Sequence, residues 1–149
     1  MQPYFRDAVG TDVPAIGAIL RGSDAKDGCE APQVGWYRDA LAEIDRTAGN
    51  YLLVAEYDNQ IVAVLQLLAF RHLDARGGRT AHIALLRVAE EFRTSGVGSM
   101  LLDHAGGRAS DLGCCRLQVM CSTGAVDEHQ FWERSGFVQL DRGYVRRLA

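Results

Sequence analysis

The hexapeptide RTSGVG, residues 93 to 98, holds one arginine, two hydroxyl side chains and two glycines. It follows an apolar run that ends at Val88 and leads into a helical pattern that includes Met100. The first amides of a helix have no partner inside it, and the helix dipole adds partial positive charge there. Glycine leaves such amides accessible. The segment therefore predicts a site for a phosphorylated ligand, and a diphosphate suits it best.

A ligand-free turn explains the same glycines, because glycine is the usual residue of tight strand-to-helix turns. The hexapeptide does not match either of two well-known phosphate-binding motifs. The segment lacks the Gly-Lys-Ser/Thr ending of a P-loop, and Leu101 stands where the dinucleotide fingerprint has its third glycine. The hexapeptide by itself does not distinguish a diphosphate site from a ligand-free turn.

The composition of the whole chain narrows the class of protein. The 149 residues fit a single domain over 1–149, and the formal net charge of -3 leaves no basic face for nucleic acid. No apolar run approaches the ~20 residues that span a bilayer, and the N-terminus does not resemble a signal peptide. We therefore expect a cytoplasmic protein without membrane partners. The four cysteines lack zinc-type spacing, so we expect reduced thiols and no metal.

Hydrophobic periodicity predicts the elements that position the hexapeptide. The expected strands cover 51–57, 61–70, 79–88 and 114–121, with a short first strand near residue 4 and a last hairpin over 137–149. The expected helices cover 13–21, 36–50, 95–113 and 126–135. The order βααβββαβαββ predicts an α/β (α+β) fold, with a mixed, mainly antiparallel sheet flanked by helices.

Three segments resemble, in order, those of the GCN5-related N-acetyltransferase (GNAT) superfamily. YFRDAVGTDVPAI is similar to the family's first strand and helix, and LLRVAEEFRTSGVGSMLLDHA to its core segment with Arg-x-x-Gly-x-Gly. HQFWERSGF is similar to its C-terminal segment. The resemblance covers most of the chain. It implies a bulged strand ending near Val88 that splays from the strand starting near Cys115.

The resemblance implies acetyl-CoA as the co-substrate, held by backbone amides of the glycine turn and of the splayed strand. It also places the helix 126–135 beside the thiol end. The cofactor contacts that it implies are Leu86, Arg87, Val88, Arg93, Thr94, Ser95, Gly96, Val97, Gly98, Ser99, Ser122, Phe131 and Trp132. The implied reaction is direct attack of a primary amine on the thioester.

Two positions depart from the family pattern. Trp132 replaces the tyrosine that often protonates the thiolate, and an indole cannot deliver a proton near neutral pH. Ala84 stands where a glutamate base is frequent. His82 is our candidate base, because strand alternation puts it on the face of Ala84 and imidazole titrates in the useful range. A histidine hydrogen-bonded to a strand neighbour is the alternative.

Three residues are candidates for the acceptor site. They are His72 in the 71–78 loop, Glu30 among the acidic residues of 22–39, and Tyr144 on the expected last strand. Each has a plain alternative: a solvated turn, a solvated acidic face and a cross-hairpin pair. The acceptor is expected to be a small-molecule amine.

Two other functions stay open: a non-catalytic acyl-CoA-binding regulatory module of the same fold, and a peptide or protein N-acetyltransferase. The missing tyrosine and glutamate favour the binding module. The C-terminal strand is a candidate for sheet pairing in a homodimer, although the arginines of GYVRRLA also suit a protected edge.

Overall fold

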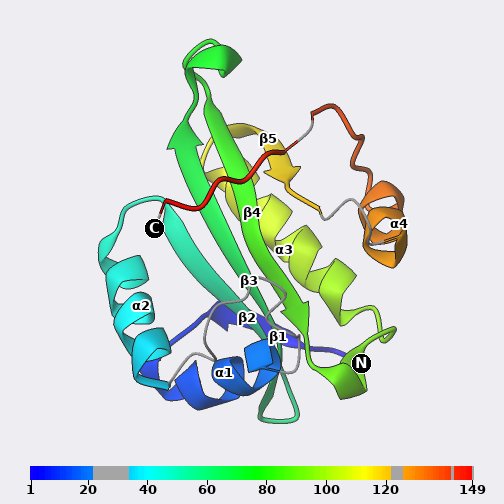
Figure 1. The fold of residues 1–149 in the computed structure, drawn as a ribbon. Coiled ribbons are helices and arrows are strands. Elements are labelled where there is room, and N and C mark those ends of the chain that lie inside the picture. The colour runs from blue at the N-terminus through cyan, green and yellow to red at the C-terminus, as the bar shows by residue number, and fades with distance from the viewer. Residues whose placement is uncertain (22–33, 122–125, 142, 149) are drawn as a thin grey trace.

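The computed structural model describes residues 1–21, 34–121, 126–141 and 143–148. Within these residues, five strands form one sheet in the order β1-β2-β3-β4-β5, and four α-helices accompany it (Figure 1). The strands are β1 (Tyr4–Asp7), β2 (Asn50–Tyr57), β3 (Gln60–Arg71), β4 (Arg79–Val88) and β5 (Cys114–Val119). The helices are α1 (Val13–Arg21), α2 (Val34–Arg46), α3 (Val97–Asp111) and α4 (Val126–Arg134).

The sheet is mixed, as expected: β1 to β4 are antiparallel neighbours, and β5 joins β4 in parallel through the crossover helix α3. Alternating side chains divide the core between its two faces. Leu53 and Leu65 pack with Leu101 of α3, whereas Val54 and Val64 pack against α1 and α2. The predicted fold class is therefore confirmed. Within the described residues, no helix is long and apolar enough to cross a membrane.

A bulge interrupts β4 at the position where the family resemblance implied one. Gln66 of β3 pairs with Leu85 of β4, while the next residue, Leu67, pairs with Ile83. Ala84 is therefore an extra residue without a cross-strand partner, and it is exposed. Such a bulge bends the strand and increases its local twist.

Beyond the bulge, β4 separates from β5. Their parallel pairing ends where Ile83 meets Val119, the last residue of β5, yet β4 continues to Val88. The second half of β4 thus has β3 on one side and a free edge on the other. This is the predicted splay, which we call the β4–β5 opening.

The predicted last hairpin is wrong for the described residues, since 137–141 and 143–148 contain no strand. Phe137 is partly buried, but five further apolar side chains of this segment are exposed by 76% or more: Val138, Leu140, Tyr144, Val145 and Leu148. Alternation marks a segment that can pair as a strand, but pairing also needs a neighbouring strand and a face to bury. The described part of this segment pairs with no strand, so the observed order of the described elements is βααβββαβα.

An ion-pair cluster ties β1 to the start of α1 and to β2. The Arg6 guanidinium donates to both carboxylate oxygens of Asp12, at 2.7 and 2.9 Å, and to Glu56 at 2.9 Å. Asp12 also accepts the Val9 amide at 2.8 Å and is nearly buried. The hydrogen bonds from Arg6 are the main reason that the Asp12 pKa lies below its ordinary value.

We predict that Asp12→Asn lowers the free energy of unfolding at pH 7 by about 2 kcal/mol, because it weakens charge-assisted hydrogen bonds at a nearly buried site. Since the folded-state pKa is depressed, this stabilisation is present at neutral pH and is lost as acid protonates the carboxylate. The gap between variant and wild type should therefore narrow below about pH 4. Urea unfolding measures it, with exposed Asp39→Asn as the control; equal losses in both variants would contradict the prediction.

Candidate active site

The connection from β4 to α3 forms the predicted glycine turn. A short 3-10 turn, Glu90–Phe92, leads into it, and α3 begins at Val97. Thr94 and Gly96 both have a positive φ, of 67° and 87°, so both residues adopt a left-handed backbone conformation. Gly96 is the N-cap and offers no side chain to cap the helix. The backbone amides in the first turn of α3 are therefore not capped by a side chain of the N-cap residue.

Three of the seven amides of residues 93–99 donate inside the protein. Those of Arg93 and Ser95 donate to carbonyl oxygens at 3.3 and 3.2 Å, and that of Val97 to the Ser95 hydroxyl at 3.3 Å. Within the described part of the chain, four amides have no acceptor, those of Thr94, Gly96, Gly98 and Ser99. This group of donors at a helix N-terminus is what an anion such as a diphosphate requires.

The two glycines of the turn also have reasons in the fold itself. Gly96 has a positive φ, a backbone conformation that residues other than glycine adopt only at a cost in conformational energy. At Gly98 a Cβ would lie 3.2 Å from Cγ2 of Val88 and 4.0 Å from Phe131. Close packing of α3 on β4 therefore explains Gly98, and the plain-turn alternative accounts for both glycines.

The Ser95 hydroxyl is already engaged. It donates to the Phe92 carbonyl at 2.5 Å while accepting from Val97. Its expected use as a donor to the ligand would require this bond to break. Ser99 lies in the first turn of α3 and is exposed, so its hydroxyl stays a predicted donor.

The free edge of β4 carries further amide donors. The Ala89 amide donates to the Val62 carbonyl on β3 at 2.8 Å. Because successive amides of a strand point to opposite sides, those of Val88 and Leu86 point away from β3. They face the β4–β5 opening, where no strand pairs with them. Both residues are among the cofactor contacts that the family resemblance implied on the splayed strand.

His82 lies on the opposite face of β4 from α3, next to the bulge. Its cross-strand partners are Leu68 on β3 and Gln118 on β5. Its Nδ1 atom is buried and has no hydrogen-bond partner in the described structure. Burial lowers the pKa of the imidazole below its ordinary value. The ring is therefore neutral at pH 7 and can accept a proton.

Two amide side chains near His82 were not among the predicted site residues. Gln118 on β5 is the cross-strand partner of His82. Gln66 lies on β3, two residues before the Leu68 that pairs with His82, and its side-chain amide donates to Asn50 Oδ1 at 3.1 Å. Strand alternation predicts which face of its strand each glutamine side chain occupies. Its closeness to His82 also depends on the register between neighbouring strands, which alternation does not give. Arg87 also lies on this face, since it pairs with Val64, and it is exposed.

The predicted acceptor residues do not gather at this place. His72 caps a short turn at the tip of the β3–β4 hairpin, where its Nδ1 accepts the Asp74 amide at 3.2 Å. Tyr144 is 88% exposed and belongs to no strand, so neither its predicted strand nor its cross-hairpin pair is found. Glu30 and Ser122 lie outside the described residues.

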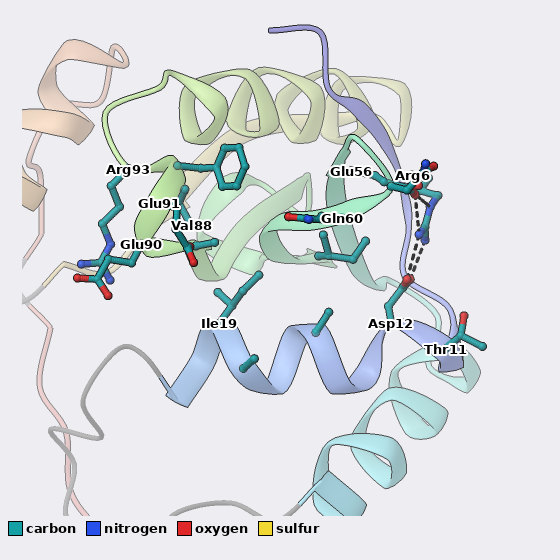
Figure 2. A pocket seen from close by; sticks show the side chains of 16 residues that line it. Arg6, Thr11, Asp12, Ile19, Glu56, Gln60, Val88, Glu90, Glu91 and Arg93 are labelled. Atoms are coloured by element: carbon teal, nitrogen blue, oxygen red, sulfur yellow. Dashed lines mark hydrogen bonds and ion pairs between the residues drawn. The ribbon is translucent and has the colours of Figure 1, made fainter.

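A pocket of about 830 Å³ lies beside the glycine turn, between α1, the β2–β3 turn and the Glu90–Phe92 turn. Figure 2 shows Arg6 with Asp12 and Glu56 at one end and Glu90, Glu91 and Arg93 at the other. The Arg93 side chain thus lies at the same end of the pocket as the carboxylates of Glu90 and Glu91. Its predicted role in neutralising a diphosphate stays a prediction, although it forms no ion pair with any described residue.

Comparisons with known proteins agree with this architecture. Residues 23–137 match the model of the Acetyltransferase (GNAT) family, and the chain belongs to this family. A transcriptional regulator from Bacillus halodurans C-125 is 27% identical, with a TM-score of 0.88 and coverage of 99% of this chain and 100% of its own. A putative acetyltransferase from Agrobacterium tumefaciens str. C58 is 24% identical, with a TM-score of 0.84 and coverage of 97% and 99%.

A more distant structure is that of the aminoglycoside N-acetyltransferase AAC(6')-Iy in complex with CoA. It is 13% identical, with a TM-score of 0.83 and coverage of 98% of this chain and 94% of its own, so the likeness is one of fold. No curated protein matches the chain. The GNAT family uses acetyl-CoA, which agrees with the donor-rich turn and opening.

We predict that Gly98→Val lowers the free energy of unfolding by about 1–3 kcal/mol, because its side chain would overlap Val88. Gly107→Ala is the matched control on the same helix, where a Cβ meets nothing within 4 Å. It should raise stability by about 0.5–1 kcal/mol. Urea unfolding of both variants tests the close approach, and a fully stable Gly98→Val protein would contradict it.

Proposed function

We propose that this chain is an N-acetyltransferase that moves the acetyl group of acetyl-CoA to a primary amine of a small molecule by direct attack. The observation that carries the proposal is the set of four amides without acceptors at the start of α3, in continuity with the free edge of β4. Both features offer hydrogen-bond donors to one ligand that combines a diphosphate with an extended amide arm. Membership of the GNAT family supports the same ligand.

The residues present fit acetyl-CoA at each part of this path. The amides of Thr94, Gly96, Gly98 and Ser99 would hold the diphosphate, and those of Leu86 and Val88 would pair with the arm. When bound, acetyl-CoA supplies the thioester from which the acetyl group is transferred. An amide at the free edge of β4 would polarise the thioester carbonyl, because a fixed donor stabilises negative charge that develops on oxygen.

His82 is the proposed general base. An amine arrives mainly as an ammonium ion and must lose a proton before it can attack. The neutral His82 ring lies on the face of β4 opposite α3, beside the exposed Ala84. Two features support this role: its lowered pKa and the lack of any partner for Nδ1 in the described residues. Trp132 supplies no acid, so the thiolate would leave unprotonated or take its proton from water.

A regulatory acyl-CoA-binding module is the second candidate. Two observations favour it: the absence of the frequent tyrosine and glutamate, and the likeness to a transcriptional regulator. Turnover separates the two functions. Release of the CoA thiol across a panel of small primary amines supports the enzyme, whereas cofactor binding without release with any amine supports the module.

We predict that saturating acetyl-CoA raises the melting temperature by several degrees, because a ligand at 100-fold excess over Kd adds about 2.7 kcal/mol to the folded state. Gly98→Trp should abolish the shift, because the new side chain would displace Val88 and Phe131 beside the start of α3 and so distort the turn that carries the free amides. Gly107→Trp, at an open position on the same helix, should keep it. A wild-type protein that does not respond to millimolar acetyl-CoA would count against both candidate functions.

We predict that kcat/KM rises with pH along a limb below about pH 6.5, because His82 must be neutral and burial lowers its pKa. His82→Gln should slow turnover about 100-fold at pH 7 and remove this limb. The charged described residues on the same face of β4 and β5 are Arg87 and Arg116, which stay cationic throughout. An unchanged pH profile in His82→Gln would exclude His82 as the base.

A further inference from the structure

The three strands that form the candidate site carry positive charge and no negative charge. β3, β4 and β5 contain no aspartate or glutamate, and their four arginines are Arg71, Arg79, Arg87 and Arg116. Among the described residues, none of these arginines forms an ion pair. The chain as a whole has 19 acidic against 16 basic side chains. The charge of these strands is therefore opposite to the net charge of the chain.

Arg116 lies on the same face of the sheet as His82. On β5, Arg116 pairs with Thr80 of β4, and Gln118 pairs with His82. Because side chains alternate along a strand, residues 116 and 118 share one face with residues 80 and 82. Two residues of a strand span about 7 Å, a distance that an arginine side chain can cover. Arg116 is therefore a close cationic neighbour of the proposed base.

A buried hydroxyl holds the Arg116 guanidinium. Nε of Arg116 donates to Oγ1 of Thr80 at 3.0 Å, and Thr80 is fully buried whereas Arg116 is exposed. The two terminal nitrogens of the guanidinium take no part in this bond. A guanidinium binds a carboxylate or a phosphate through paired N–H groups of this kind. Arg116 is therefore a positioned anion-binding group on the face of His82.

The position of Arg116 excludes the diphosphate as its partner. Its cross-strand neighbour Thr80 precedes Val88, the last residue of β4 before the glycine turn, by eight residues. Eight strand residues span about 26 Å, far beyond the length of an arginine side chain. At Thr80, β4 and β5 are still paired, so Arg116 lies outside the β4–β5 opening. An anion bound by Arg116 would therefore belong to the acceptor.

We infer that the acceptor amine also carries an anionic group, a carboxylate or a phosphate, and that Arg116 binds this group. The inference rests on the proposed function, because it requires an amine to react beside His82. The acceptor is then a small molecule with charges of both signs, such as an amino acid or an amino phosphate. Polyamines and aminoglycosides carry cations alone, and both Arg116 and Arg87 on this face would repel them.

Thiol release with matched amines tests the class of acceptor. Phosphoethanolamine is compared with ethanolamine, and β-alanine with β-alaninamide, since the members of each pair differ in the anion. Spermidine represents the polycations. We expect the anionic member of at least one pair to exceed its neutral partner about 10- to 100-fold in kcat/KM, the effect of hydrogen bonds between charged groups. The pair that responds distinguishes phosphate from carboxylate.

Arg116→Gln should remove this preference. It should raise KM for the anionic amine about 10- to 100-fold and leave KM for the neutral amine unchanged, while the glutamine amide can still donate to Thr80. Arg116→Lys keeps the charge and should recover part of the preference. Arg79→Gln is the matched control, because it removes the same charge from the same end of β4, on the opposite face with Ala81. It should keep the preference.

The outcomes separate the inference from the proposed function. Absence of thiol release with every amine removes the proposed enzyme, and this inference with it. Release that is as fast with the neutral amines or spermidine as with both anionic amines overturns the inference alone. An unchanged preference in Arg116→Gln contradicts it too. Equal losses in Arg116→Gln and Arg79→Gln, or an equal rise of KM for both members of a pair, overturn it as well, since general charge or a distorted site would then explain the effect.

Discussion

The separation of β4 from β5 is the feature on which the rest of the site depends. Parallel pairing ends at Ile83 and Val119, one residue before the bulge at Ala84. A continuous ladder would have used the amides of Leu86 and Val88 within the sheet. Because the bulge bends β4 away, those amides have no strand partner, and this half of β4 has the unpaired amides of an edge strand.

The glycine turn extends this donor surface to the start of α3. Three amides of the turn donate to acceptors within the turn, and four have no acceptor among the described residues. The Ser95 hydroxyl belongs to the first group, because it stabilises the turn by accepting from Val97. Gly98 allows α3 to approach Val88 closely, because a Cβ at this position would lie 3.2 Å from Val88 Cγ2. Packing of the helix on the strand is therefore the reason for glycine at this position.

The two faces of β4 have different chemistry. The aromatic rings of α4 pack on the face toward α3. The amide donors of Leu86 and Val88 lie between the two faces, along the free edge of the strand. On the other face, His82 and Gln118 lie beside the bulge, and burial keeps the imidazole neutral. A thioester held at the opening on one side and an amine approaching from the other would meet at the bulge. Ala84 and Trp132 occupy the positions where the family frequently has a glutamate and a tyrosine.

The sequence by itself determined the elements and the binding turn. Periodicity located β2 to β5 and all four helices to within a few residues, and the glycines marked the turn, because these signals are local in the chain. Alternation also indicated a last hairpin that the described residues do not form, since a strand requires a partner that no local pattern supplies. Only the tertiary structure decided that Gln66 and Gln118 lie near His82, that Tyr144 is exposed, and that the Trp132 indole is buried without an acceptor. Register, burial and unsatisfied donors arise from contacts between segments far apart in the chain.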